Sequence, residues 1–275
     1  MDSTKLAVFA LMAACLMAIT GSAQGPHTLE VSAVFHHFSY EEDLTPPLKS
    51  TETGWLPGLQ CAYNYAGPKI PAFVRFSFNY TKASTDYDGS TQEGIPVQAK
   101  TDNIFMEFEG RIGYSFRMDQ AATVSLAPYV GLGYHYWKRG GGGDYPYDEI
   151  YTWKYVPIGL RAAYLPRPRL QLSLDVAAKI MFGGEILVEL SDIDPGLNDP
   201  KAGLDNKVGW RFQGEASYQI SKRWFALFSP WFEYSAIGKS DVFELNYSGW
   251  SWGYGYEPAS TTYRYGLNIG LRGIL

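Results

Sequence analysis

The sequence predicts an all-β protein built as an antiparallel ten-stranded transmembrane β-barrel. Apolar and polar residues alternate with a period of two along segments that recur through most of the chain, as they do in half-buried strands. Short and long connections alternate between these segments. After the N-terminal segment, no apolar run reaches the roughly 20 residues that a membrane-spanning helix needs, so the sequence predicts spans made of strands.

Length and composition agree with this class. A chain of 275 residues suits one large all-β domain. The 46% hydrophobic and 16% aromatic content excludes a disordered chain, and the net charge of −5 argues against a nucleic-acid-binding protein. The two cysteines, Cys15 and Cys61, are too few for a disulfide framework or a zinc site.

Residues 1–23 have the form of a signal peptide. Lys5 precedes the apolar segment Leu6–Ile19, and small residues follow it up to Ala23, where we expect cleavage. Lipid attachment at Cys15 is the alternative, but the apolar segment continues past this cysteine. The barrel domain is therefore expected over residues 24–275.

Alternation defines each expected strand. From Leu170 to Phe182, for example, the even positions are apolar and the odd positions are mostly small, polar or charged. The ten predicted strands are Leu29–Phe38, Trp55–Tyr65, Ala72–Thr81, Ile104–Phe116, Val124–Tyr136, Val156–Tyr164, Leu170–Phe182, Trp210–Ile220, Trp224–Ser235 and Tyr263–Leu275.

The connections indicate how these strands sit in a membrane. The short ones are Ala66–Pro71, Arg117–Gln120, Pro166–Arg169 and Ser221–Arg223, and the long ones are Glu41–Gly54, Lys82–Val97, Lys138–Tyr151, Glu189–Lys207 and Asn246–Ser260. An even strand number with tight turns at one end and long loops at the other is typical of bacterial outer-membrane barrels. We therefore expect a monomer in the outer membrane of a Gram-negative bacterium, in contact with lipid and lipopolysaccharide.

A secreted β-sandwich would alternate too, but it would not need aromatic residues at both strand ends. Two such groups occur, and they predict belts at the two membrane interfaces. The first group, near the short turns, is Tyr63, Tyr65, Tyr114, Phe116 and Tyr164, and the second, near the long loops, is Tyr134, Tyr136, Trp137 and Trp153.

The face opposite the apolar one lines the barrel and carries charges of both signs. Its thirteen charged members are Glu30, Arg75, Glu107, Glu109, Arg111, Arg161, Asp175, Lys179, Arg211, Glu215, Glu233, Arg264 and Arg272. Seven cations against six anions predict a closed network of ion pairs, because unpaired buried charges are costly. A proton or ion path is the alternative reading of the same residues.

The order of features resembles the omptin family of outer-membrane proteases, in particular from Tyr155-Val156-Pro157-Ile158-Gly159-Leu160-Arg161 through to the acidic segment ending at Asp194-Pro195. The resemblance implies an endopeptidase with an Asp pair at Asp86 and Asp88 and an Asp-x-His at Asp194. Gly196 stands where that histidine is required, and no histidine follows His135. Asp86 and Asp88 also fit a solvated loop, or a turn with Gly89.

Other candidate chemistry is sparse, and we predict no cofactor and no metal site. His36 and His37 cannot both face one ion from a regular strand, whereas His36 and His135 are expected near the same rim. The glycine-rich run from Arg139 to Asp144 lacks the Lys-Ser/Thr of a phosphate loop and predicts a flexible loop tip.

The fifth long loop is the most distinctive. Aromatic and small residues alternate in it, which on an extended hairpin predicts a strip formed by Trp250, Trp252, Tyr254 and Tyr256. Such a strip suits an extracellular sugar or protein ligand; the alternative is a hairpin that only extends the barrel. The sequence thus favours binding, adhesion or an envelope-structural role over two alternatives, an omptin-like endopeptidase and a narrow channel for small solutes.

Overall fold

The computed structural model describes residues 27–275 except 68, 92, 122 and 141–146. The signal-peptide prediction and Cys15 lie outside the described residues. Ten of the strands form the barrel: β1 (His27–Glu42), β2 (Ser50–Ala66), β3 (Ala72–Ser90), β4 (Pro96–Tyr114), β6 (Val124–Gly140), β7 (Asp148–Arg167), β8 (Leu170–Val188), β10 (Val208–Gln219), β11 (Trp224–Ile237) and β14 (Ser260–Ile274).

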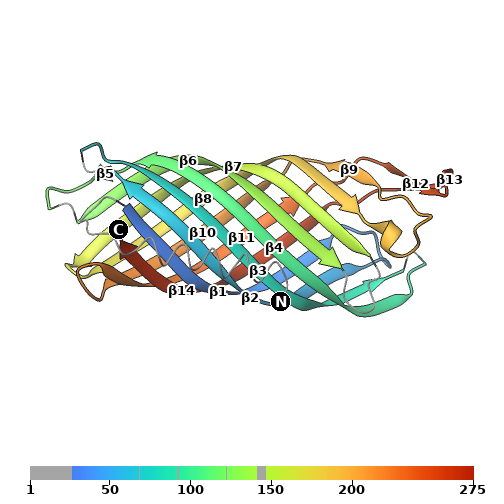
Figure 1. The fold of residues 1–275 in the computed structure, drawn as a ribbon, viewed down its shortest axis with the longest axis horizontal. Helices are drawn as coiled ribbons and strands as arrows, with labels where there is room; N and C mark the ends of the chain where they lie inside the picture. Colours follow the sequence, from blue (N-terminus) through green and yellow to red (C-terminus); the bar gives the residue numbers. More distant parts are fainter. Residues whose placement is uncertain (1–26, 68, 92, 122, 141–146) are drawn as a thin grey trace.

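These strands form one closed antiparallel barrel (Figure 1). Each pairs with its neighbours in the chain, β1 pairs with β14, and β10 pairs with β8, so no barrel strand has a free edge. Closure satisfies the backbone groups that lipid cannot. The predicted fold class, strand number and topology are confirmed.

The remaining elements lie at the two ends. β5 (Phe116–Arg117) extends the short-turn end beside β6. At the opposite end, β9 (Lys201–Leu204) pairs with β8 after the 3₁₀ turn η2 (Leu190–Asp192). The hairpin of β12 (Phe243–Tyr247) and β13 (Trp250–Gly255) projects at the right-hand end of the barrel in Figure 1.

The barrel strands are longer than the sequence predicts, and the difference lies at the long-loop end. The predicted loop Lys82–Val97 is mostly strand, because β3 continues to Ser90 and β4 begins at Pro96. A bilayer needs only about 9–11 residues of a tilted strand, whereas β7 has 20. The barrel therefore extends well beyond the membrane on its outer side.

The extension was missed because the alternation inverts along the strands. In the lower part of β3, Phe76 faces outward at 58% exposure and Arg75 faces inward. In its upper part, Tyr87 is buried inside and Asp86 is exposed outside. Lipid around the lower barrel requires apolar residues outside, and water around the upper barrel requires them inside.

This inversion corrects the outer aromatic belt. Trp137 and Trp153 are 1% and 8% exposed and pack inside the upper barrel, so their assignment to the membrane interface was wrong. The other two members of the predicted group, Tyr134 and Tyr136, do face outward, as do Trp55 and Tyr265. At the short-turn end, the predicted belt residues Tyr114, Phe116 and Tyr164 are 41%, 49% and 50% exposed, as expected.

The thirteen predicted interior charges face inward, and each makes at least one ion pair with another of them. Near the short turns, Arg272 bridges Glu30 and Glu215 at 2.6 and 2.8 Å. Higher up, Lys179 lies 2.9 Å from Glu233. The predicted network of ion pairs is confirmed.

Above this network lies an aromatic and aliphatic core. It includes Phe38, Phe105 and Trp137, whose rings are 5.1–5.7 Å apart between centroids. Tyr151 stacks on Trp137 at 4.6 Å. The interior is thus layered, with ion pairs at membrane level and an apolar core above them.

Candidate functional site

A buried polar cluster closes the outer end of the barrel above the apolar core. Its centre is Arg139 at the end of β6, which is 2% exposed and donates from Nε to Glu52 and from Nη1 to Glu149, both at 2.7 Å. Glu42 lies 3.9 Å from the same guanidinium. Arg139 is therefore a structural centre, and its prediction as part of a flexible loop tip was wrong.

Glu52 is the most enclosed carboxylate of this cluster, with 0% exposure. It accepts hydrogen bonds from the side chains of Thr85, Thr101 and Asn103. Burial alone would raise the pKa of Glu52, but Arg139 and the hydroxyl donors hold that pKa below its usual value. Glu52 is thus held as a charged acceptor.

Glu257, which precedes β14, behaves in the opposite way. Tyr151 and Tyr40 donate to its Oε1 at 2.7 and 3.2 Å. Burial, followed by the charges of Glu149 and Glu42, raises the pKa of Glu257 to about 8. The carboxyl group therefore carries a proton at neutral pH.

Glu257 also anchors the base of the β12–β13 hairpin. Its backbone N–H donates to Ser240 Oγ at 2.7 Å, and the Ser240 N–H donates back to the Glu257 carbonyl at 2.9 Å. Ser240 lies just before β12 and Glu257 just after β13. Glu257 therefore links the buried polar cluster to the base of the hairpin.

The hairpin displays the four predicted aromatic residues. Trp250, Trp252, Tyr254 and Tyr256 are 81%, 61%, 72% and 51% exposed. Its turn is Ser248-Gly249, both with positive φ of 49° and 84°, as a tight hairpin turn requires.

The four side chains do not follow one regular strip. The register shifts by a β-bulge where Leu245 pairs with Gly253 and Asn246 with Ser251. A bulge re-aims the side chains beside it, so the regular alternation from Trp250 onward is interrupted at Trp252. Tyr256 is also covered by Lys239, whose Nζ lies 3.8 Å from the ring centroid.

The omptin resemblance suggested a site that combines Asp86 and Asp88 with Asp194, but the structure does not bring the pair and Asp194 together. Asp86 and Asp88 face outward on β3, where Asp86 pairs with Lys100 and Asp88 with Lys49 at 2.5 Å. Asp194 lies in the loop after β8, and β4, β6 and β7 separate that strand from β3.

Asp194 instead supports the loops around it. Its Oδ1 accepts from the Gly196 N–H at 2.8 Å, and the Tyr247 hydroxyl donates to its Oδ2 at 3.4 Å. Asp194 therefore ties the fourth long loop to the hairpin.

His36 and His135 are both inside the barrel, at 1% and 2% exposure. Each ring packs against Phe105, with centroids 6.5 and 5.9 Å away. His135 also stacks on Trp153 at 4.0 Å and hydrogen-bonds Glu107 at 3.2 Å. Their placement is that of packed interior residues.

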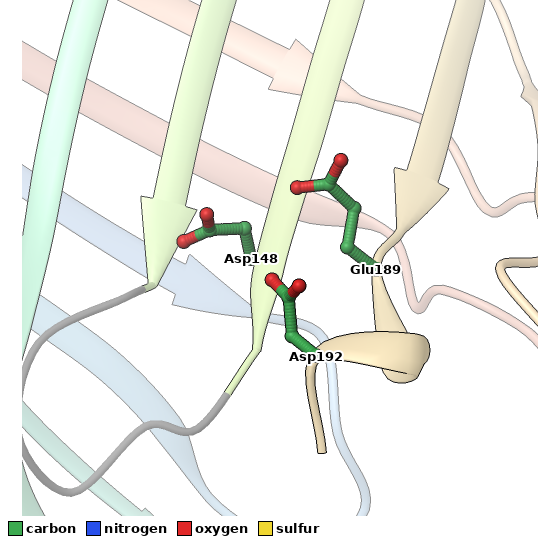
Figure 2. Close-up of side chains that lie close together, drawn as sticks. All are labelled: Asp148, Glu189 and Asp192. Carbon is green, nitrogen blue, oxygen red and sulfur yellow. The ribbon is translucent and has the colours of Figure 1, made fainter. Parts of the chain in front are cut away.

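A second acidic group lies on the outer side of the barrel end. Figure 2 shows Asp148 at the start of β7 beside Glu189 and Asp192 on the turn that follows β8; one oxygen of each lies within 4.8 Å of the others. Carboxylates of this kind suit a hard cation such as Ca²⁺. Lys138 already supplies one positive charge through its ion pair with Asp148.

Sequence reasoning missed Arg139, Glu52, Glu149 and Glu257. All four lie in segments expected to be loops, and the inward direction of the first three follows only once β2, β6 and β7 are extended. One signal was present: Arg139 shares the parity of the inward His135 and Trp137.

No protein-family model matches the sequence, and no curated protein matches it either. Among solved structures, the outer membrane protease OmpT of Escherichia coli is similar, with a TM-score of 0.63 and 11% identity over 94% of this chain and 100% of that chain. The translocator domain of the autotransporter NalP from Neisseria meningitidis gives 0.43 and 10%, over 99% and 98% of the two chains. OprG of Pseudomonas aeruginosa gives 0.40 and 10%, over 90% and 96%.

The likeness to OmpT confirms the predicted resemblance to the omptin family at the level of fold. A shared barrel does not carry shared chemistry. The fold and the apolar outward face of the lower barrel identify the chain as an outer-membrane β-barrel protein, located in the bacterial outer membrane.

Proposed function

We propose that the protein is a non-enzymatic surface-binding protein whose ligand contact is the β12–β13 hairpin. The observation that carries the proposal is the exposure of four large aromatic side chains, between 51% and 81%, on an element that projects past the barrel end. Exposed apolar groups of this kind on a soluble surface mark interaction sites. Trp and Tyr supply large rigid contact areas at low entropic cost.

The contacts at the outer end of the barrel favour a rigidly held binding hairpin over a catalytic cleft. The hairpin is held at its base by the reciprocal Glu257–Ser240 bonds and at its side by Tyr247 on Asp194. The Asp86 and Asp88 carboxylates are neutralised by lysines on the outer wall. A rigid base lowers the entropy lost when the hairpin binds.

The test displays the barrel on bacterial cells and measures their attachment to immobilised mucin, a surface that offers both glycans and protein. We expect the triple substitution Trp250→Ala, Trp252→Ala, Tyr254→Ala to reduce attachment at least tenfold, since each hot-spot truncation typically costs 1–2 kcal/mol or more. The matched control is Ile70→Ala, which removes an exposed apolar side chain at the opposite end of the barrel.

Two outcomes oppose the proposal. Equal attachment by the triple variant and the unsubstituted protein would remove the hairpin from binding. Cleavage of Lys- and Arg-containing peptides by the refolded barrel, lost in Asp86→Ala and Asp194→Ala, would favour the endopeptidase alternative.

A further inference from the structure

The ion-pair network within the membrane encloses a cavity of about 40 Å³. Six charged side chains line it: the guanidiniums of Arg75, Arg111, Arg211 and Arg264, and the carboxylates of Glu107 and Glu233. The remaining lining residues are uncharged. The wall of the cavity therefore carries four positive charges and two negative ones.

The whole network carries a smaller excess. Below the apolar core, the described inward-facing residues comprise seven Arg or Lys and six Asp or Glu, so the formal sum is 7 − 6 = +1. Each of the seven cations is ion-paired, and the side chain of Arg161 is 29% exposed. The excess of positive charge is therefore concentrated on the cavity wall, where an anion would be stabilised.

One residue of the cavity wall also has an unused hydrogen-bond donor. Arg211 Nε is fully buried and has no hydrogen-bond partner within the described part of the chain, although both Nη atoms of this residue bind Glu109 at 3.2 Å. The amide oxygen of Asn79, another lining residue, is likewise buried without a partner. The two ends of an amide are assigned by their contacts, so the opposite orientation of Asn79 would offer a second donor.

We propose that this cavity binds one halide ion, chloride under ordinary conditions, which balances the excess guanidinium charge. One water needs about 10–15 Å³ of such space, so the cavity has room for one monatomic anion together with one or two waters. The apolar core above and the Glu30–Arg272–Glu215 layer below keep the ion in place, which makes the site structural and not a conduction path.

The first experiment measures thermal unfolding of the refolded barrel in detergent, with sodium gluconate replaced stepwise by sodium chloride at constant ionic strength. A ligand bound only by the folded state raises Tm progressively with its concentration. We expect Tm to rise with chloride and with bromide and to approach a plateau as the site fills, whereas a Tm that stays at its value in gluconate would overturn the proposal.

The substitution Gln213→Glu tests the charge argument directly. Gln213 lines the cavity, and a carboxylate there would add a negative charge to the wall without changing the side-chain size. We expect Gln213→Glu to melt above the unsubstituted protein in gluconate and to lose its response to chloride. Gln98→Glu, the same change on the exposed outer part of β4, is the control and should keep that response.

A crystal grown in sodium bromide locates the ion independently of any variant. The expected result is an anomalous peak in the cavity within hydrogen-bonding distance of Arg211 Nε. No peak in the cavity would overturn the proposal and assign the space to water, and this measurement decides if Gln213→Glu fails to fold.

Discussion

At the scale of single residues, the outer end of the barrel shows how one cation organises several acids. Arg139 is shared by Glu52 and Glu149, and Glu257 lies beside them, where it accepts hydrogen bonds from Tyr151 and Tyr40. Arg139 and the hydroxyl donors keep Glu52 ionised, whereas burial and the neighbouring carboxylates keep Glu257 protonated. Burial raises the pKa of both acids, so the difference between them comes from the partners that oppose burial at Glu52.

Glu257 makes stability depend on pH. Its pKa of about 8 in the folded state lies above the ordinary value of 4.5, so the folded state holds this proton more tightly than the unfolded state. The resulting stabilisation is complete below about pH 4.5, declines as pH rises, and is lost above about pH 8. We expect the Tm of the refolded barrel to fall between about pH 5.5 and 8.5, because over this range Glu257 is protonated in more of the folded molecules than of the unfolded ones.

Glu257→Gln keeps an acceptor for Tyr151 and Tyr40 but cannot ionise, so its Tm should change less over that window. Glu244→Gln is the control, because Glu244 is exposed on β12. Its Tm should fall with pH as steeply as that of the unsubstituted protein. A slope that is unchanged in Glu257→Gln would contradict the assignment of the proton to this residue.

At the scale of elements, the strands change their environment halfway along. The same backbone ladder continues from the membrane into the extracellular medium, while the side that carries apolar residues switches from outside to inside. Both halves of a strand obey period-two alternation. A prediction that expects apolar residues on the same face along the whole strand therefore ends each strand where the apolar residues change sides.

Because of this switch, an outward-facing arginine should be costly at membrane level and nearly neutral above the membrane. Leu174→Arg, on the lipid-facing side of β8 with 53% exposure, should cost about 2–4 kcal/mol and reduce insertion, because a charge would enter the lipid. Thr53→Arg, outward-facing and exposed on the upper part of β2, should change stability by less than about 0.5 kcal/mol.

Both variants are folded into lipid vesicles, and the folded fraction is measured from the gel mobility of unheated samples, in which the folded barrel migrates differently from the unfolded chain. If Leu174→Arg inserts as well as Thr53→Arg does, the proposed membrane boundary is misplaced.

At the scale of the whole molecule, three layers close the interior. Ion pairs occupy the membrane level, the aromatic core lies above them, and the Arg139 cluster covers the outer end. A cavity of about 40 Å³ lies in the ion-pair layer. The barrel is therefore organised as a solid support for its outer loops.

This layering predicts that the barrel does not conduct. In planar lipid bilayers we expect no resolvable single-channel steps in potassium chloride, because the core of Phe38, Phe105 and Trp137 blocks the axis. Trp137→Gly with Phe105→Gly removes most of that layer and serves as the comparison. Steady conductance of the unsubstituted protein would support the narrow-channel alternative.

The architecture at membrane level could be predicted from the sequence. Strand number, the alternation of turns and loops, and the inward direction of residues such as Arg211 and Glu109 all followed from period-two alternation, since lipid imposes one simple rule on every strand it surrounds. The exposure of Trp250 and Trp252 on a hairpin followed from local turn and strand signals in the same way.

The arrangement of residues above the membrane could not be predicted from the sequence and depends on how the barrel closes. There, water replaces lipid outside the barrel, so polarity no longer marks the outward face, and Arg139 in a glycine-rich segment is indistinguishable from a loop residue. The cluster of Arg139, Glu52, Glu149 and Glu257 joins residues up to 205 positions apart (257 − 52). Contacts at such separations are set by barrel closure and register, which no local pattern encodes.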